Sequence, residues 1–197
     1  IGSIISVQIA ETSKYIAKYC GKANTSKAIL YTIIPNVLIF GSLVAILIGF
    51  PGWKAPFSNT LGYLCVKGSP PDTGISADFN TLMKSNIDND LMKKIIEDKS
   101  LIINEITPGN FDAFIAKMYE NNLLNVSYDK LIELEGASEV KDTRMQEYLD
   151  AFSRLYRAVA LKDLVAEIAW YFLTGILVIS MIKNSVAEIE CEKSKSD

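Results

Sequence analysis

The fold is decided by residues 50–63, which have the sequence FPGWKAPFSNTLGY. No residue from Ala28 to Trp53 carries a charge, and charges return at once with Lys54. Aromatic rings with polar tips favour the water interface of a bilayer, so Trp53 and Tyr63 suit that depth. The proline and glycine that precede Trp53 favour the end of a helix. The stretch therefore predicts the point at which the chain leaves a membrane.

Two runs of apolar residues are long enough to cross a bilayer, residues 28–53 and residues 164–183. At about 1.5 Å of rise per residue, about twenty helical residues cover a hydrocarbon core about 30 Å thick. Together with an apolar share of 49% and a mean hydropathy of +0.19, these runs indicate a membrane protein. An apolar stripe without proline leads into the second run from residue 138, which predicts one long helix continuous with the second span.

The predicted fold class is an all-α membrane protein in which two transmembrane helices flank a mostly helical polar domain. Its segments are a basic amphipathic helix over 1–27, transmembrane helix 1 over 28–53, the helical polar domain over 54–163, transmembrane helix 2 over 164–183 and a polar tail over 184–197. We expect the polar domain to start as irregular, extended chain through residue 74, because prolines and glycines punctuate it. Apolar spacing then predicts helices over 78–86, 91–99, 110–120 and 127–134.

Residues 1–27 carry isoleucines near one helical face and lysines at a four-residue step on another. Such a helix either lies on a membrane with its lysines toward anionic headgroups or packs on a neighbouring protein. More cations precede the first span than follow it. This asymmetry favours a cytosolic N-terminus, a polar domain on the far side and a cytosolic C-terminus.

Polar residues inside the predicted spans need partners. Pro35 and Asn36 either form a kink that faces another helix or lie near the entry side. The entry side is favoured, because Pro35 comes early in the run. Glu167 is a carboxylate within the second span, which is costly and often functional. Because it lies near the boundary, where it can reach water, a structural role is favoured.

The composition excludes most common chemistry. There is no histidine, which removes the usual general base and zinc ligand. The three cysteines, Cys20, Cys65 and Cys191, are far apart, and we expect them to be unpaired thiols. No phosphate loop, metal-ligand cluster or acid–base–nucleophile set emerges, so we expect no enzyme, no cofactor and no metal site. A net charge of −3 argues against a nucleic-acid partner.

The run Phe50-Pro51-Gly52-Trp53, then Pro56-Phe57-Ser58-Asn59-Thr60 and Gly62-Tyr63, resembles a motif in small membrane proteins of the large nucleocytoplasmic DNA viruses, including the chlorella-virus and mimivirus-like groups. The resemblance covers residues 50–63 and the two-span layout. It implies a minor capsid type of virion protein, seated in the internal membrane beneath an icosahedral capsid and in a host membrane during assembly. The implied partners are membrane lipids and capsid or other virion membrane proteins. Self-association into a homo-oligomer is left open.

The predicted function is thus a structural, membrane-anchored virion protein that links the internal membrane to capsid proteins. Residues 56–60 either dock a partner or pack back on their own domain, since they combine apolar and hydrogen-bonding groups. The alternative function is a small oligomeric channel or transporter subunit, which needs polar groups such as Asn36, Ser42, Thr174, Ser180 and Glu167 on facing spans. The residues predicted at the membrane interface or in partner docking are Pro51, Gly52, Trp53, Pro56, Phe57, Ser58, Asn59, Thr60, Gly62, Tyr63, Trp170 and Lys183.

Overall fold

The computed structural model describes residues 2–67, 74–84, 99–134 and 142–189. Every regular element within these ranges is a helix, apart from an isolated antiparallel bridge between Met83 and Leu124. Contacts divide the chain into two compact units. Unit 1 comprises residues 1–53 and 168–197, and unit 2 comprises residues 54–167. The helical class is therefore confirmed for the described part of the chain.

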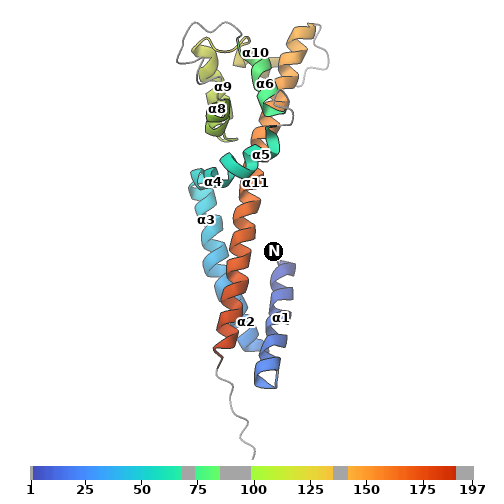
Figure 1. The fold of residues 1–197 in the computed structure, drawn as a ribbon, viewed down its shortest axis with the longest axis vertical. Coiled ribbons are helices and arrows are strands. Elements are labelled where there is room, and N and C mark those ends of the chain that lie inside the picture. Colours follow the sequence, from blue (N-terminus) through green and yellow to red (C-terminus); the bar gives the residue numbers. More distant parts are fainter. Residues whose placement is uncertain (1, 68–73, 85–98, 135–141, 190–197) are drawn as a thin grey trace, which may run out of the picture. The chain divides into compact units, whose positions relative to one another are not determined.

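Helix α11 runs from Thr143 to Ala187 and contributes residues to both units (Figure 1). It is 45 residues long and contains the second apolar run. The prediction of one long helix continuous with that run is confirmed. The helix continues past Lys183 because the residues that follow include no proline or glycine before it ends.

The first apolar run is also one continuous helix, from Thr25 to Gly49. It consists of α2 (Thr25–Pro35), a π-helical turn η1 (Asn36–Phe40) and α3 (Gly41–Gly49). The side chain of Asn24 caps its start by accepting a hydrogen bond from the Lys27 amide at 3.0 Å. The π turn follows Pro35, whose missing N–H interrupts the regular hydrogen-bond ladder.

Helix α1 (Gly2–Cys20) packs within unit 1 against α2 and the C-terminal part of α11 (Figure 1). Its register with the helix Thr25–Gly49 follows two hydrogen-bonded pairs, Gln8 with Asn36 of η1 and Thr12 with Thr32 of α2. Asn36 Nδ2 donates to Gln8 Oε1 at 3.0 Å, and Thr32 Oγ1 donates to Thr12 Oγ1 at 3.1 Å. Ile16 and Ala28 are buried in the same apolar cluster.

The structure of unit 1 corrects two expectations, the surroundings of Asn36 and the length of the first helix. Asn36 faces another helix, so the interpretation that it simply lies near the entry side is wrong. The reason is that its amide hydrogen-bonds both Gln8 and the Thr32 carbonyl, which offers partners that an apolar surrounding lacks. The amphipathic helix over 1–27 is shorter than predicted, since α1 ends at Cys20 and Gly21 adopts a positive φ of 73°. Whether α1 also touches a membrane stays a prediction.

Residues 51–66 are helical, which corrects the expectation of irregular, extended structure there, whereas residues 68–73 of the same prediction lie outside the described residues. The helical elements are η2 (Pro51–Lys54), α4 (Ala55–Phe57), the π turn η3 (Ser58–Gly62) and α5 (Tyr63–Val66). Pro51 is the first residue of η2, and Pro56 lies in the first turn of α4. A proline at a helix start loses no hydrogen bond, because the first N–H groups of a helix have no intrahelical partner.

Unit 2 adds short helices around a buried apolar core. They are α6 (Ile75–Leu82), α8 (Lys99–Glu105), α9 (Phe111–Glu120) and α10 (Tyr128–Leu134). The core brings Phe79, Phe111 and Ile115 against Leu155 and Val159 of α11. The helices predicted over 110–120 and 127–134 are confirmed, and the one over 78–86 begins earlier and ends at Leu82. The helix predicted over 91–99 lies almost wholly outside the described residues.

Candidate functional site

Two tryptophans meet in unit 1 where the first apolar helix has ended. Trp170 Nε1 on α11 donates a hydrogen bond to the carbonyl oxygen of Trp53 at 2.9 Å. Their ring centroids are 6.4 Å apart, with the planes tilted by 44°. A second aromatic pair is formed by Phe40 of η1, which stacks on Tyr171 of α11 with ring centroids 5.5 Å apart. Both predicted interface tryptophans thus belong to one aromatic contact, between α11 and the 3₁₀ turn of Pro51–Lys54 that follows the first apolar helix.

The first charged residue after the uncharged run forms an ion-pair cluster within unit 2. Lys54 Nζ lies 2.8 Å from Asp163 Oδ2 and 3.3 Å from Glu167 Oε2. The two acids are four residues apart on α11, so they share a face of the helix. Burial acts to lower the pKa of Lys54, but the hydrogen bonds and negative charges of Asp163 and Glu167 outweigh it and raise that pKa above its ordinary value.

A second lysine of unit 2, Lys162 on α11, is fully buried. Lys162 is 1% exposed, and its Nζ donates to the carbonyl oxygen of Ile103 at 2.8 Å and to Asn59 Oδ1 at 3.4 Å. Burial lowers the pKa of Lys162 to about 8, against the opposing pull of Asp163 and Glu105. The ammonium therefore holds three separate segments together at a cost in desolvation.

Gly62 lies against the backbone of α11. A Cβ built on Gly62 would come within 2.3 Å of the Lys162 carbonyl oxygen, a distance that no side chain tolerates. A glycine is therefore required for η3 to approach α11 this closely. Ser58 is buried on the same turn, and Tyr63 packs against the core of unit 2.

The predicted site residues divide by exposure. The exposed ones are Pro51, Gly52, Trp53, Pro56, Thr60 and, near the C-terminal end of α11, Lys183. The partly buried ones are Phe57, Asn59, Tyr63 and Trp170, and the buried ones are Ser58 and Gly62. Of the two alternatives for residues 56–60, packing back on their own domain is what Ser58 and Asn59 do. The exposed apolar side chains nearby are Leu61 and Leu64. Docking of a partner stays a prediction.

Sequence reasoning missed the three residues that fix this region, Lys54, Lys162 and Asp163. The sequence does hint at an ion pair here, since Asp163 and Glu167 are one helical turn apart at the start of the second apolar run. The first lysine after the uncharged run is their natural partner, but its position more than a hundred residues earlier hides the pairing.

The thiols differ from the expectation of three unpaired cysteines. Cys20 is disulfide-bonded, so that expectation is wrong for this residue. Cys65 is a free, exposed thiol, and Cys191 lies outside the described residues. Sequence spacing cannot reveal a bond of this kind, because disulfide geometry depends on Cα atoms that meet in space. Within the described ranges, no group of three Cys, Asp or Glu side chains could hold a metal ion.

Comparison with known proteins gives no match to a family model, to a curated protein or to a solved structure. The resemblance to viral membrane proteins therefore rests on residues 50–63 and the arrangement of the two apolar runs.

Proposed function

We propose that the protein is a structural membrane anchor in which two helices of unit 1 cross a bilayer and unit 2 is a protein-binding domain outside it. The observation that carries this proposal is how little of the two apolar helices is covered. In each of them, only 22% of the most apolar stretch is buried. A core helix of a water-soluble protein buries such a surface, whereas a bilayer covers it in the absence of other protein.

The uncovered side chains are large and lie all along both helices. They include Ile34, Val37, Leu38, Ile48, Ile168, Phe172, Leu173, Ile176 and Leu177. Removal of apolar surface from water contributes about 25 cal/mol per Å², so a bilayer that covers this surface stabilises the protein considerably. Both apolar runs are helical, which is the structure that pairs most backbone groups within one segment, as a hydrocarbon surrounding requires.

The contacts at residues 53 and 54 support the same placement. Trp53 and Trp170 carry apolar rings with polar tips, which suits the boundary between hydrocarbon and water. Next along the chain, Lys54 is paired with two carboxylates, and a charged cluster of this kind favours the aqueous side of that boundary. The predicted exit point of the first span agrees with both observations.

As the partner of unit 2 we propose a capsid or other virion membrane protein, which makes the chain a minor capsid type of protein in an internal virion membrane. The resemblance of residues 50–63 supports this choice of partner. The surface proposed to bind it is the outward side of η3 and α5, where Thr60, Leu61 and Leu64 are exposed. Exposed apolar side chains beside polar groups are typical of protein interfaces.

The membrane part is tested by flotation of the full chain with lipid vesicles, followed by extraction at alkaline pH. We expect the protein to float and to resist extraction. Recovery in the soluble fraction would contradict the anchor.

The partner part is tested by a photo-crosslinking amino acid placed at Leu64 in intact particles. Leu101 on α8 is a matched control, because the two leucines are 59% and 56% exposed. We expect a crosslink to a capsid or membrane protein from position 64 and none from position 101. Equal crosslinking from both positions would remove the case for this surface.

The alternative of a channel is not adopted, because three of the five polar side chains named for it are engaged. Asn36 binds Gln8, Ser42 Oγ donates to the Leu38 carbonyl, and Glu167 pairs with Lys54. Ion flux in liposomes that Glu167→Gln abolishes would restore the channel hypothesis.

A further inference from the structure

A long groove runs between α1 and α11 in unit 1. Its first part has a volume of about 520 Å³ and is lined by apolar side chains, among them Ile4 and Ile5 of α1 and Phe172 and Ile176 of α11. Its second part, of about 260 Å³, adjoins the first at Gln8 and Ile179, which line both. The two parts are therefore neighbours along α1 and α11.

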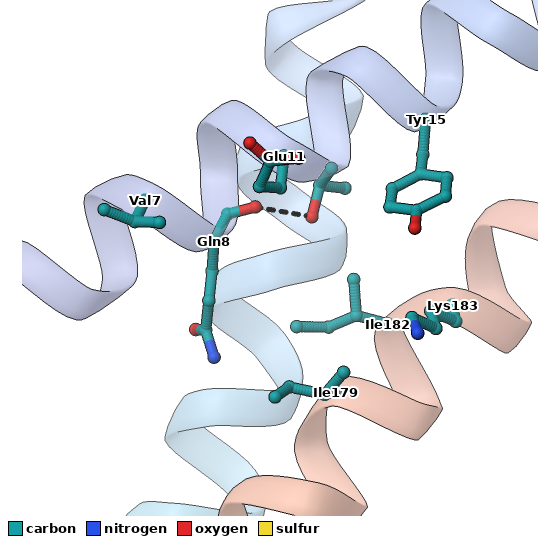
Figure 2. Close-up of a pocket in the computed structure, with 8 residues that line it drawn as sticks. Val7, Gln8, Glu11, Tyr15, Ile179, Ile182 and Lys183 are labelled. Atoms are coloured by element: carbon teal, nitrogen blue, oxygen red, sulfur yellow. Dashed lines mark hydrogen bonds between the residues drawn. The ribbon is translucent and has the colours of Figure 1, made fainter.

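The second part is polar at its end (Figure 2). Figure 2 shows Val7, Gln8, Glu11 and Tyr15 of α1 facing Ile179, Ile182 and Lys183 of α11. Glu11 is already paired, since it accepts a hydrogen bond from Lys14 at 2.6 Å. Lys183 is exposed and has no ion pair in the part of the chain that the structure describes. Lys14, which does not line the groove, offsets the charge of Glu11, so the positive charge of Lys183 is the one left uncompensated among the described lining residues.

The hydrogen bonds between α1 and α2 place this groove beside the middle of the first apolar helix. Asn36, which binds Gln8, is the twelfth of the 25 residues in the helix Thr25–Gly49. Ile4, which lines the first part of the groove, and Val7, which lines the second, are both exposed. The apolar part of the groove therefore adjoins the surface that we assign to lipid, and its polar end lies toward the lysines of α1 and α11.

We propose that this groove binds one membrane phospholipid with an anionic headgroup. An acyl chain lies against Ile5, Phe172 and Ile176, and the phosphate lies near Lys183. This inference rests on the proposed membrane location of unit 1. A phospholipid fits because the groove changes from apolar to cationic along its length, in the same order as a lipid changes from chain to headgroup.

The test uses the full chain in nanodiscs of zwitterionic phospholipid that contain a minor share of anionic phospholipid with a photoreactive acyl chain. Gly175→Leu fills the apolar part, because a Cβ at Gly175 meets nothing within 4 Å. Gly41→Leu is the matched control, since Gly41 is also helical, also meets nothing within 4 Å and lies away from the groove. Lys183→Gln, with Lys22→Gln as its control, tests the headgroup.

We expect lipid adducts on α1 and α11 around Ile5 and Ile176. Gly175→Leu removes them and Gly41→Leu does not. Lys183→Gln lowers the labelling by the anionic lipid about fivefold, and Lys22→Gln leaves it unchanged. Labelling by a zwitterionic analogue does not change with Lys183→Gln.

Three outcomes would overturn the proposal. They are equal labelling in the two leucine variants, equal labelling by both lipids, or a crosslinked dimer through these helices, which would make a second copy the occupant. Failure of the chain to enter nanodiscs at all would instead overturn the membrane anchor, so the two failures are distinguishable. Circular dichroism of each variant verifies that it is folded.

Discussion

Gly62 and Lys162 lie a hundred residues apart in the chain, yet a Cβ at Gly62 would come within 2.3 Å of the Lys162 carbonyl oxygen. The contact belongs to the backbone on the Lys162 side, so it cannot be relieved by a change of rotamer. It fixes how closely η3 approaches α11 within unit 2.

Gly62→Ala is expected to destabilise the protein by about 1–3 kcal/mol, because the new methyl group forces η3 away from α11. Chemical denaturation in detergent, followed by circular dichroism, measures this loss. Gly52→Ala is the control, since a Cβ at Gly52 meets nothing within 4 Å. Equal stability of the two variants would show that the close approach is absent in solution.

Because Lys162 is buried, we expect the free energy of unfolding to rise at alkaline pH. The pKa of Lys162 is about 8 in the folded protein and about 10.5 in the unfolded chain. Between these values the unfolded state binds more protons, so the free energy of unfolding increases as the pH rises from about 8 toward 10.5. The full difference amounts to about 3 kcal/mol. Lys162→Met is expected to lack this increase, as measured by denaturation at a series of pH values.

Lys54 does not obscure that measurement. Its pKa is raised in the folded state, so its stabilising effect is fully present below its unfolded value of about 10.5 and is lost only above it. If the wild type and Lys162→Met respond alike between pH 8 and 10, the ammonium is not buried as described.

The ion pair between Lys54 and Asp163 is expected to contribute more than an exposed one. A double-mutant cycle with Lys54→Met and Asp163→Asn should give a coupling energy of about 1–3 kcal/mol, because both side chains are largely buried. The exposed pair of Lys14 and Glu11 is the control and should give about 0–0.5 kcal/mol. Comparable coupling energies in the two cycles would argue against the cluster.

The hydrogen bonds of Asn36 predict a loss of stability in detergent. Asn36→Leu removes the bonds to Gln8 and to the Thr32 carbonyl and should cost about 1 kcal/mol. Unfolding in mixed detergent micelles measures the cost. Ser42→Ala is the control, since the Ser42 hydroxyl bonds only the Leu38 carbonyl of its own helix. A neutral Asn36→Leu would mean that α1 does not pack on α2.

Thiol labelling separates the cysteines. We expect a maleimide to modify Cys65 in the folded protein and to reach Cys20 only after reduction. Mass spectrometry of peptides identifies the modified residues. Disulfides are rare in reducing compartments, so a blocked Cys20 in protein taken directly from cells would argue against the predicted cytosolic N-terminus. Labelling of Cys20 without reductant would contradict the disulfide.

Local pattern identified several of the helices but not the segments that they contact. The stripe before residue 164 predicted α11, and apolar spacing predicted the helices over 110–120 and 127–134. The prediction of irregular structure was wrong over residues 54–66, because Pro51 and Pro56 were taken as helix breakers where they begin helices. Asn36 was recognised as a polar group in need of a partner, but Gln8 could not be identified as that partner.

By itself, the sequence determined the helical class, the two apolar runs and the absence of histidine chemistry, since these follow from periodicity, length and residue type. The tertiary structure alone decided that Lys54 pairs with Asp163, that Gly62 lies against Lys162 and that Gln8 binds Asn36. The physical reason is that burial and hydrophobic periodicity specify which face of a helix turns inward but not which distant segment it meets. That choice depends on side-chain shape and hydrogen-bond geometry, which appear only when the helices are packed.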